Sequence, residues 1–123
     1  MKKVLIISII VLTLVSCTLF RGRGVDFEIK NDTQFTITEV KIMTTDKSTT
    51  PVFSTIDSGQ SVSGFLKMEK DRNDGSYILE FNTKSGERRR IMTGYYSNGV
   101  PSEHKIIFKI ERDTIYYETM KYY

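Results

Sequence analysis

Apolar and polar residues alternate along most of the chain after residue 24. Val25, Phe27 and Ile29 alternate with charged residues, which is the pattern of a β-strand with one buried face. Similar runs recur, separated by short segments of Gly, Asn, Asp and Ser, which favour turns. We predict eight strands, at residues 25–30, 35–43, 52–56, 61–69, 77–81, 87–93, 104–111 and 114–120.

Two positions modify this alternation. The second predicted strand begins on the phase of Ile37 and resumes on the phase of Val40, so we expect a β-bulge near Thr38 and Glu39. Gly64 lies on the inward phase of the fourth predicted strand. Because glycine has no side chain, we expect a large neighbouring side chain to fill the space beside it.

The fold class follows from these strands. After residue 17 the chain does not sustain an apolar period near 3.6 for the length of a globular helix. Short strands with one apolar face each, separated by turns, favour two packed sheets. We therefore predict one domain at residues 25–123, an all-β Greek-key β-sandwich of about eight short antiparallel strands, immunoglobulin-like or transthyretin-like.

The first seventeen residues follow a different pattern. Two lysines precede a 12-residue apolar run from Val4 to Val15, interrupted only by Ser8 and Thr13. This layout is typical of a secretory signal peptide, and the run is shorter than the roughly 20 residues that span a bilayer as a helix. An uncleaved anchor is the alternative. Residues 1–16 are therefore predicted to be a signal peptide.

The end of that segment, Leu14-Val15-Ser16-Cys17, resembles the lipobox of bacterial lipoproteins. The resemblance implies transfer of a diacylglyceryl group to the Cys17 thiol, cleavage just before it, and palmitate on the mature protein. Cys17 is the only cysteine of the chain, so no disulfide is available to the domain. We expect residues 17–24 to be the lipidated cysteine and a flexible tether of at most about 25 Å.

The location of the anchor is suggested by the residues that follow it. Lipoproteins exported to the cell surface usually carry acidic residues after the cysteine, whereas this chain has Thr18-Leu-Phe-Arg21. We expect an outer-membrane protein that faces the periplasm. Arg21 and Arg23 either lie against anionic headgroups or are solvated charges of the tether.

The chain is also similar to the small β-sandwich lipoproteins of Bacteroidota. Many of these open with an I-x-N-x-T segment followed by V-x-I, which here corresponds to Ile29, Asn31 and Thr33 and then Val40 and Ile42. The resemblance implies a sandwich fold and a cell-envelope location. It implies no activity, because most of that group has none assigned.

The charge and the reactive residues argue against several classes of function. Without residues 1–16 the chain has 16 basic and 15 acidic residues, whereas a nucleic-acid partner needs a dense basic surface. His104 is the only histidine, and acylation of Cys17 removes the only thiol. In residues 71–75 the glycine stands one position too early for an EF-hand, so we expect a plain turn. We expect no enzyme, cofactor, metal or nucleic-acid partner.

Two features are candidates for anion or partner contact. Alternation places Arg88 and Arg90 on one face of a strand and Arg89 on the other. Arginine suits bidentate contact with phosphate or carboxylate, but charged residues also protect an edge strand from aggregation. Tyr95 and Tyr96 lie in a predicted long loop, where they either form a recognition surface or fold back to plug one end of the sandwich.

Together these observations predict a membrane-tethered, non-catalytic binding or assembly lipoprotein of the bacterial cell envelope. It is held by the lipid on Cys17 and binds a protein partner. One alternative is an inhibitor or immunity lipoprotein that acts on a toxin or lytic enzyme through residues 94–102. Another is a structural subunit of a secretion or surface assembly. The sequence does not indicate an oligomeric state.

Overall fold

A computed structural model describes residues 22–46 and 52–121 of the chain. The predicted signal peptide, Cys17 and most of the predicted tether lie outside these residues. Within the described ranges the protein is all-β, with nine strands and no helix. The strands are β1 (Gly24–Asn31), β2 (Ile37–Thr44), β3 (Val52–Ile56), β4 (Ser61–Lys67), β5 (Gly75–Asn82), β6 (Arg88–Ser97), β7 (Val100–Pro101), β8 (Glu103–Ile110) and β9 (Ile115–Lys121).

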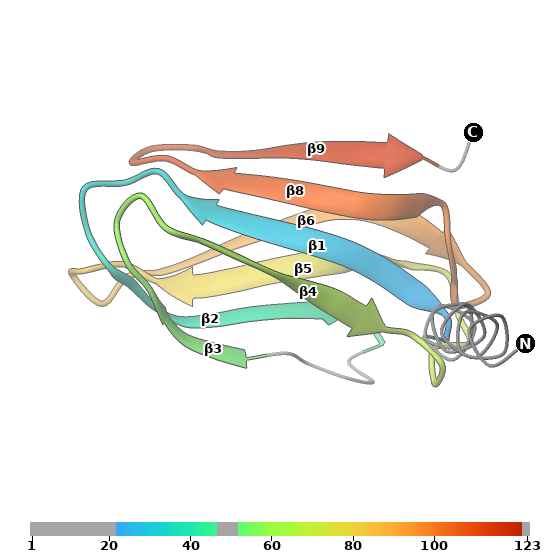
Figure 1. Cartoon of the computed structure of the whole chain (residues 1–123). Coiled ribbons are helices and arrows are strands. Elements are labelled where there is room, and N and C mark those ends of the chain that lie inside the picture. The colour runs from blue at the N-terminus through green and yellow to red at the C-terminus, as the bar shows by residue number, and fades with distance from the viewer. Residues whose placement is uncertain (1–21, 47–51, 122–123) are drawn as a thin grey trace, which may run out of the picture.

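The strands form two sheets that pack face to face, so the predicted β-sandwich is confirmed (Figure 1). One sheet has the order β4-β1-β8-β9 and the other the order β3-β2-β5-β6-β7. Neighbouring strands are antiparallel except β1 and β8, which are parallel. The expectation of antiparallel strands throughout was wrong for this pair. Side-chain periodicity reports which face is buried and carries no information on the direction of a neighbour.

The strand order bears on the immunoglobulin-like alternative. β1 and β2 lie in different sheets, whereas the first two strands of an immunoglobulin constant domain share one sheet. The strand order therefore differs from that of an immunoglobulin constant domain, and the transthyretin-like alternative stays a prediction. β7 is the one strand that we did not predict, and it lies inside the segment that we expected to be a loop.

The core lies between the sheets and consists of the inward residues of both. Val25, Phe27 and Ile29 of β1 are buried, as their alternation predicted. Leu66, Met68, Tyr77, Leu79, Phe81, Ile106, Phe108 and Ile110 are buried with them. Burial of an aliphatic or aromatic side chain stabilises the fold by about 1.5–3 kcal/mol. None of the described residues forms a helix that could span a membrane.

Both predicted irregularities are present. The register between β2 and β5 shifts between Thr38 and Lys41, and Glu39 has a positive φ of 48°, so the β-bulge is confirmed. Gly64 pairs with Phe27 in the neighbouring strand. A Cβ on Gly64 would lie 2.9 Å from Cζ of Phe27. The phenylalanine ring therefore fills the space beside the glycine.

A buried asparagine organises the turn between β1 and β2. Asn31 is 0% exposed, and its Nδ2 donates to the carbonyl oxygens of Phe35 and Ile56, at 2.7 and 2.9 Å. Its Oδ1 accepts from the backbone N–H of Thr33 at 3.1 Å and from the Thr33 hydroxyl at 2.6 Å. The Asn and Thr of the I-x-N-x-T segment therefore join the ends of β1 and β3 to this turn.

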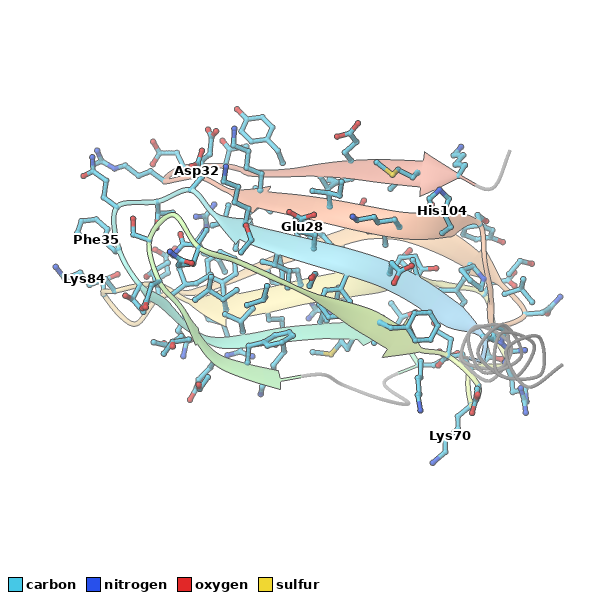
Figure 2. All side chains as sticks on the ribbon, viewed as in Figure 1. Glu28, Asp32, Phe35, Lys70, Lys84 and His104 are labelled. Carbon is cyan, nitrogen blue, oxygen red and sulfur yellow. The ribbon has the colours of Figure 1, made fainter. Side chains whose placement is uncertain are left out.

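The two ends of the sandwich differ in which strands begin and finish there. The N-terminal end is where β1 and β8 begin and β4, β6 and β9 finish, and the distal end is the opposite one (Figure 1). In Figure 2, Lys70 and His104 lie at the N-terminal end and Phe35 and Lys84 at the distal end. The Lys84 ammonium lies 4.6 Å from the centre of the Phe35 ring.

Candidate functional site

The predicted arginine pair lies on the outer face of β6. Arg88 and Arg90 are both exposed, as the alternation predicted. Glu80 of β5 lies between them: Arg88 donates to its Oε2, and Arg90 Nε is 3.8 Å from its Oε1. The hydrogen bond from Arg88 is the main cause that lowers the pKa of Glu80. A second carboxylate, that of Glu39, is 3.7 Å from Arg88, so internal carboxylates neutralise much of this charge.

Arg89 points inward and has a structural role. Its Nη1 donates to the carbonyl oxygens of Glu111 and Arg112, at 3.0 and 3.2 Å. Its guanidinium lies 5.5 Å from the centre of the Phe81 ring, where a cation–π interaction stabilises it. Arg89 thus connects β6 to the turn between β8 and β9, and it holds the two sheets together at the distal end.

The predicted long loop is in fact a β-hairpin. β6 continues to Ser97, and β7 pairs back onto it. The turn residues Asn98 and Gly99 have φ values of 51° and 73°. A type I′ hairpin turn requires positive φ at both central residues, which is why Asn-Gly is favoured there. The Asn-Gly pair was the signal that sequence reasoning did not use.

The two tyrosines of this hairpin separate. Gly94 has a φ of 74°, and the register of β6 shifts beside it, so Tyr96 points inward and Tyr95 outward. Tyr96 is 0% exposed, its ring lies 5.6 Å from that of Tyr77, and its hydroxyl is 3.0 Å from Oγ1 of Thr45. Tyr96 therefore plugs the N-terminal end. Tyr95 is 49% exposed, so of the two tyrosines only Tyr95 is available for contact with a partner.

The segment before β5 holds the hairpin in place. Asn98 donates its backbone N–H to Oδ1 of Asp74 at 2.9 Å, and Gly99 donates to the carbonyl oxygen of Asn73 at 2.9 Å. The Asn98 hydrogen bond is the main cause that lowers the pKa of the Asp74 carboxyl, and side-chain hydrogen bonds from Ser97 and Tyr95 add to it. Residues 71–75 thus serve as a structural turn. Among the described residues no three His, Cys, Asp or Glu side chains are grouped as a metal site.

A buried carboxyl lies behind the hairpin. Glu103, the first residue of β8, is 4% exposed, and burial raises the pKa of its carboxyl. The backbone N–H groups of Tyr95 and Glu103 itself donate to it, and Lys121 lies near enough to act on it electrostatically. His104, the next residue, is half-buried at the same end.

Sequence reasoning missed the exposed character of β9, the edge strand of the four-stranded sheet. Among the described residues, seven large hydrophobic side chains are exposed, and three of them belong to β9. These three are Tyr116, Tyr117 and Met120. The strand had been predicted from alternation, but periodicity does not show whether a strand lies at an edge.

The faces of β9 follow from its register with β8. Tyr117 pairs with Phe108, whose side chain is in the core, so Tyr117 lies on the inner face and is nevertheless 52% exposed. Tyr116 and Met120 pair with Lys109 and Lys105 on the outer face. Both faces of this edge therefore present apolar area.

A groove lies at the distal end, between the beginning of β6 and the turn that leads into β9. Its volume is about 430 Å³. Its lining residues are Arg89, Arg90, Ile91, Asp113, Thr114 and Ile115. Ile91 and Ile115 also pack against the core. The groove is therefore a small apolar site with charged side chains at its rim, next to the beginning of β9.

Comparisons with known proteins address the fold alone. A scan against models of known protein families finds no match, and a search of curated proteins finds no related sequence. The structure is similar to the NMR structure of a protein from Eubacterium rectale, with a TM-score of 0.54 and 15% sequence identity. The alignment covers 80% of this chain and 90% of that chain. The shared property is the all-β architecture.

Proposed function

We propose that this protein is a membrane-tethered, non-catalytic binding lipoprotein of the bacterial cell envelope, and that β9 accepts an extended segment of a protein partner. The lipobox at residues 14–17 and the preceding signal-peptide pattern support the envelope location. The exposed apolar edge of β9 is the observation that carries the binding role. An edge strand offers unpaired backbone groups to which another strand can add.

The contrast between β9 and the other edges supports this assignment. Natural proteins protect edge strands with charges, short length or covering segments. The exposed residues of β4, at the opposite edge of the same sheet, are Ser61, Ser63, Gly64 and Lys67. β3 has only five residues. β6 pairs with β7 only at its end, and the unpaired part of that edge begins with three consecutive arginines. β9 has seven residues, and its exposed charges are only Glu118 and the terminal Lys121.

The groove beside β9 indicates the chemistry of the partner. Side chains alternate across a strand, so every second side chain of a strand added to β9 would point to the inner face, and those next to Ile115 would reach the groove over Ile91 and Ile115. Apolar side chains suit these positions. Arg90 at the rim favours a carboxylate on the partner near the distal end.

Site-specific crosslinking in the source bacterium tests the binding surface. A photo-reactive residue in place of Tyr116 should give one discrete adduct, and the matched residue in place of Ser63 on β4 should give none. Met120→Glu in the same chain should abolish the Tyr116 adduct, because a charge on the edge opposes strand addition. Equal crosslinking at both edges, or an adduct that persists with Met120→Glu, would contradict the assignment.

The lipid anchor is tested separately. Mass spectrometry of the mature N-terminus should find a diacylglyceryl group on Cys17 and no residues before it. Cys17→Ser should eliminate palmitate labelling and leave the precursor unprocessed. Palmitate labelling that survives this substitution would contradict lipidation at Cys17.

A structural subunit of an envelope assembly is the second candidate, because strand addition also joins subunits. The crosslinking experiment distinguishes the two candidates. For a structural subunit, the adduct formed at position 116 would copurify with a multiprotein membrane complex instead of a single partner. The inhibitor alternative stays a prediction. It relied on an accessible loop at residues 94–102, and only Tyr95 and Val100 of the large side chains there are exposed.

A further inference from the structure

Arg23 fixes the point at which the N-terminal segment of the chain joins the sandwich. Its Nε and Nη2 donate to the carbonyl oxygen of Met68 at 3.2 and 2.9 Å, and Nη2 also donates to the carbonyl oxygen of Asp71 at 2.9 Å. The carbonyl oxygen of Arg23 accepts from the backbone N–H of Met68 at 2.8 Å. Arg23 therefore belongs to the folded domain, two residues earlier than we expected from the sequence.

This attachment shortens the tether. Only residues 18–22 separate Cys17 from Arg23, and five extended residues span about 17 Å. The headgroup region on one side of a bilayer is about 5–8 Å thick, so a fully extended tether reaches only about 10 Å beyond it. If Cys17 carries the lipid, the N-terminal end of the sandwich must stay within about 10 Å of the headgroup surface.

An exposed apolar residue lies beside this exit point. A Cβ on Gly99 would lie 3.2 Å from Nη2 of Arg23 and would collide with the carbonyl oxygen of Asp71. Val100 follows Gly99 directly and is 54% exposed. Tyr95, on the paired strand, is 49% exposed. An aliphatic side chain beside a tyrosine suits the bilayer interface, where tyrosine is enriched.

The charges of the two ends differ in sign. Among the described loop residues and the first and last strand residues at the N-terminal end, four exposed cations accompany the two exposed anions Glu69 and Asp74. The cations are Lys67, Lys70, Arg72 and Lys121. By the same criterion the distal end has three cations and four anions, namely Lys84, Arg88, Arg112, Asp32, Asp57, Glu87 and Asp113. Lys70 extends away from the body of the domain (Figure 2).

We propose that the N-terminal end of the sandwich is a second membrane contact, which docks on the anionic phospholipid surface of the bilayer that holds the anchor. Val100 enters the interface, and Lys70 and Arg72 lie against headgroup phosphates. This inference rests on the proposed acylation of Cys17. Each surface lysine or arginine near an anionic bilayer contributes about fivefold to membrane association. The anchor then fixes the orientation of the domain as well as its location.

A single-cysteine label in the acylated protein tests this orientation. Acylation leaves no free thiol, so Val100→Cys introduces a unique site for a polarity-sensitive fluorophore. Ser85→Cys, in the exposed turn at the distal end, is the matched control. Each labelled lipoprotein is reconstituted into phosphatidylcholine vesicles with and without phosphatidylglycerol, and quenching by nitroxide-labelled lipid is measured.

We expect the label at residue 100 to shift to the blue and to be quenched in phosphatidylglycerol vesicles, and the label at residue 85 to behave as in water. Lys70→Glu with Arg72→Glu should lower the docked-to-undocked ratio by roughly fivefold or more for each residue changed, and high salt should do the same. Equal quenching of both labels, or none at residue 100, would overturn the docking and leave the anchor intact. Mass spectrometry that finds no lipid on Cys17 would overturn the anchor itself, and with it the docking.

Discussion

Replacement of Asn31 by alanine should remove a large part of the stability of the domain. The variant loses four hydrogen bonds, and the carbonyl oxygen of Ile56, which lies in the buried part of this network, is left without its donor. A buried carbonyl oxygen without a donor costs about 1–3 kcal/mol. Each of the other hydrogen bonds contributes about 0.5–1.5 kcal/mol, and water recovers part of this because their partners are half-exposed. We expect a loss of about 3 kcal/mol in the free energy of unfolding.

Urea unfolding followed by circular dichroism measures this loss in the mature chain carrying Cys17→Ser. The midpoint should fall while the slope m stays constant, since the surface exposed on unfolding is unchanged. Thr33→Ala is the matched control, because its hydroxyl is at the rim of the network. It should cost about 1 kcal/mol. A loss for Asn31→Ala no larger than that of the control would refute the reasoning.

Three further substitutions examine the N-terminal end and the outer face. Burial raises the pKa of Glu103, so the folded state binds its proton more tightly than the unfolded state. Stability should fall as pH rises from the ordinary carboxyl pKa through the raised one, and Glu103→Gln should remove this slope in urea titrations. The pKa of Glu80 is lowered, so its contribution should be lost as pH falls through the lowered value, and Glu80→Gln should flatten that acid limb. Gly99→Ala should cost clearly more than the roughly 1–2 kcal/mol of backbone strain expected for Gly86→Ala. Both glycines have positive φ, but only Gly99 meets backbone atoms, those of Asp71; equal losses in thermal unfolding would contradict this contact.

The strands and their buried faces could be predicted because a strand with one buried face carries apolar residues at every second position of the sequence. β3 has the predicted bounds, and the inward residues of β1 are the predicted ones. The bulge at Glu39 was predictable for the same reason, since one extra residue reverses the phase of all that follow.

The neighbours of each strand could not be predicted in this way. The pairing of β1 with β8 joins segments about 80 residues apart, and nothing local specifies it. The same limit applies to the candidate site. A single positive-φ glycine, Gly94, sends Tyr95 outward and Tyr96 inward, and the Glu80 carboxylate that binds the two arginines comes from another strand. The exposure of β9 depends on its place in the sheet order, which is a property of the whole topology.

The two proposed surfaces constrain each other through the geometry of the sandwich. β9 runs from the distal end to the N-terminal end, where Lys121 completes it (Figure 1). If the N-terminal end docks on the bilayer, the axis of β9 points toward the membrane, and a strand added to it must do the same. Seven residues at about 3.3 Å each span roughly 23 Å. The partner must therefore present an extended segment that rises from, or descends to, the headgroup region over that height. A partner segment that lies parallel to the membrane could not pair along β9, so crosslinks from both ends of β9 to one extended segment are required by the two proposals together.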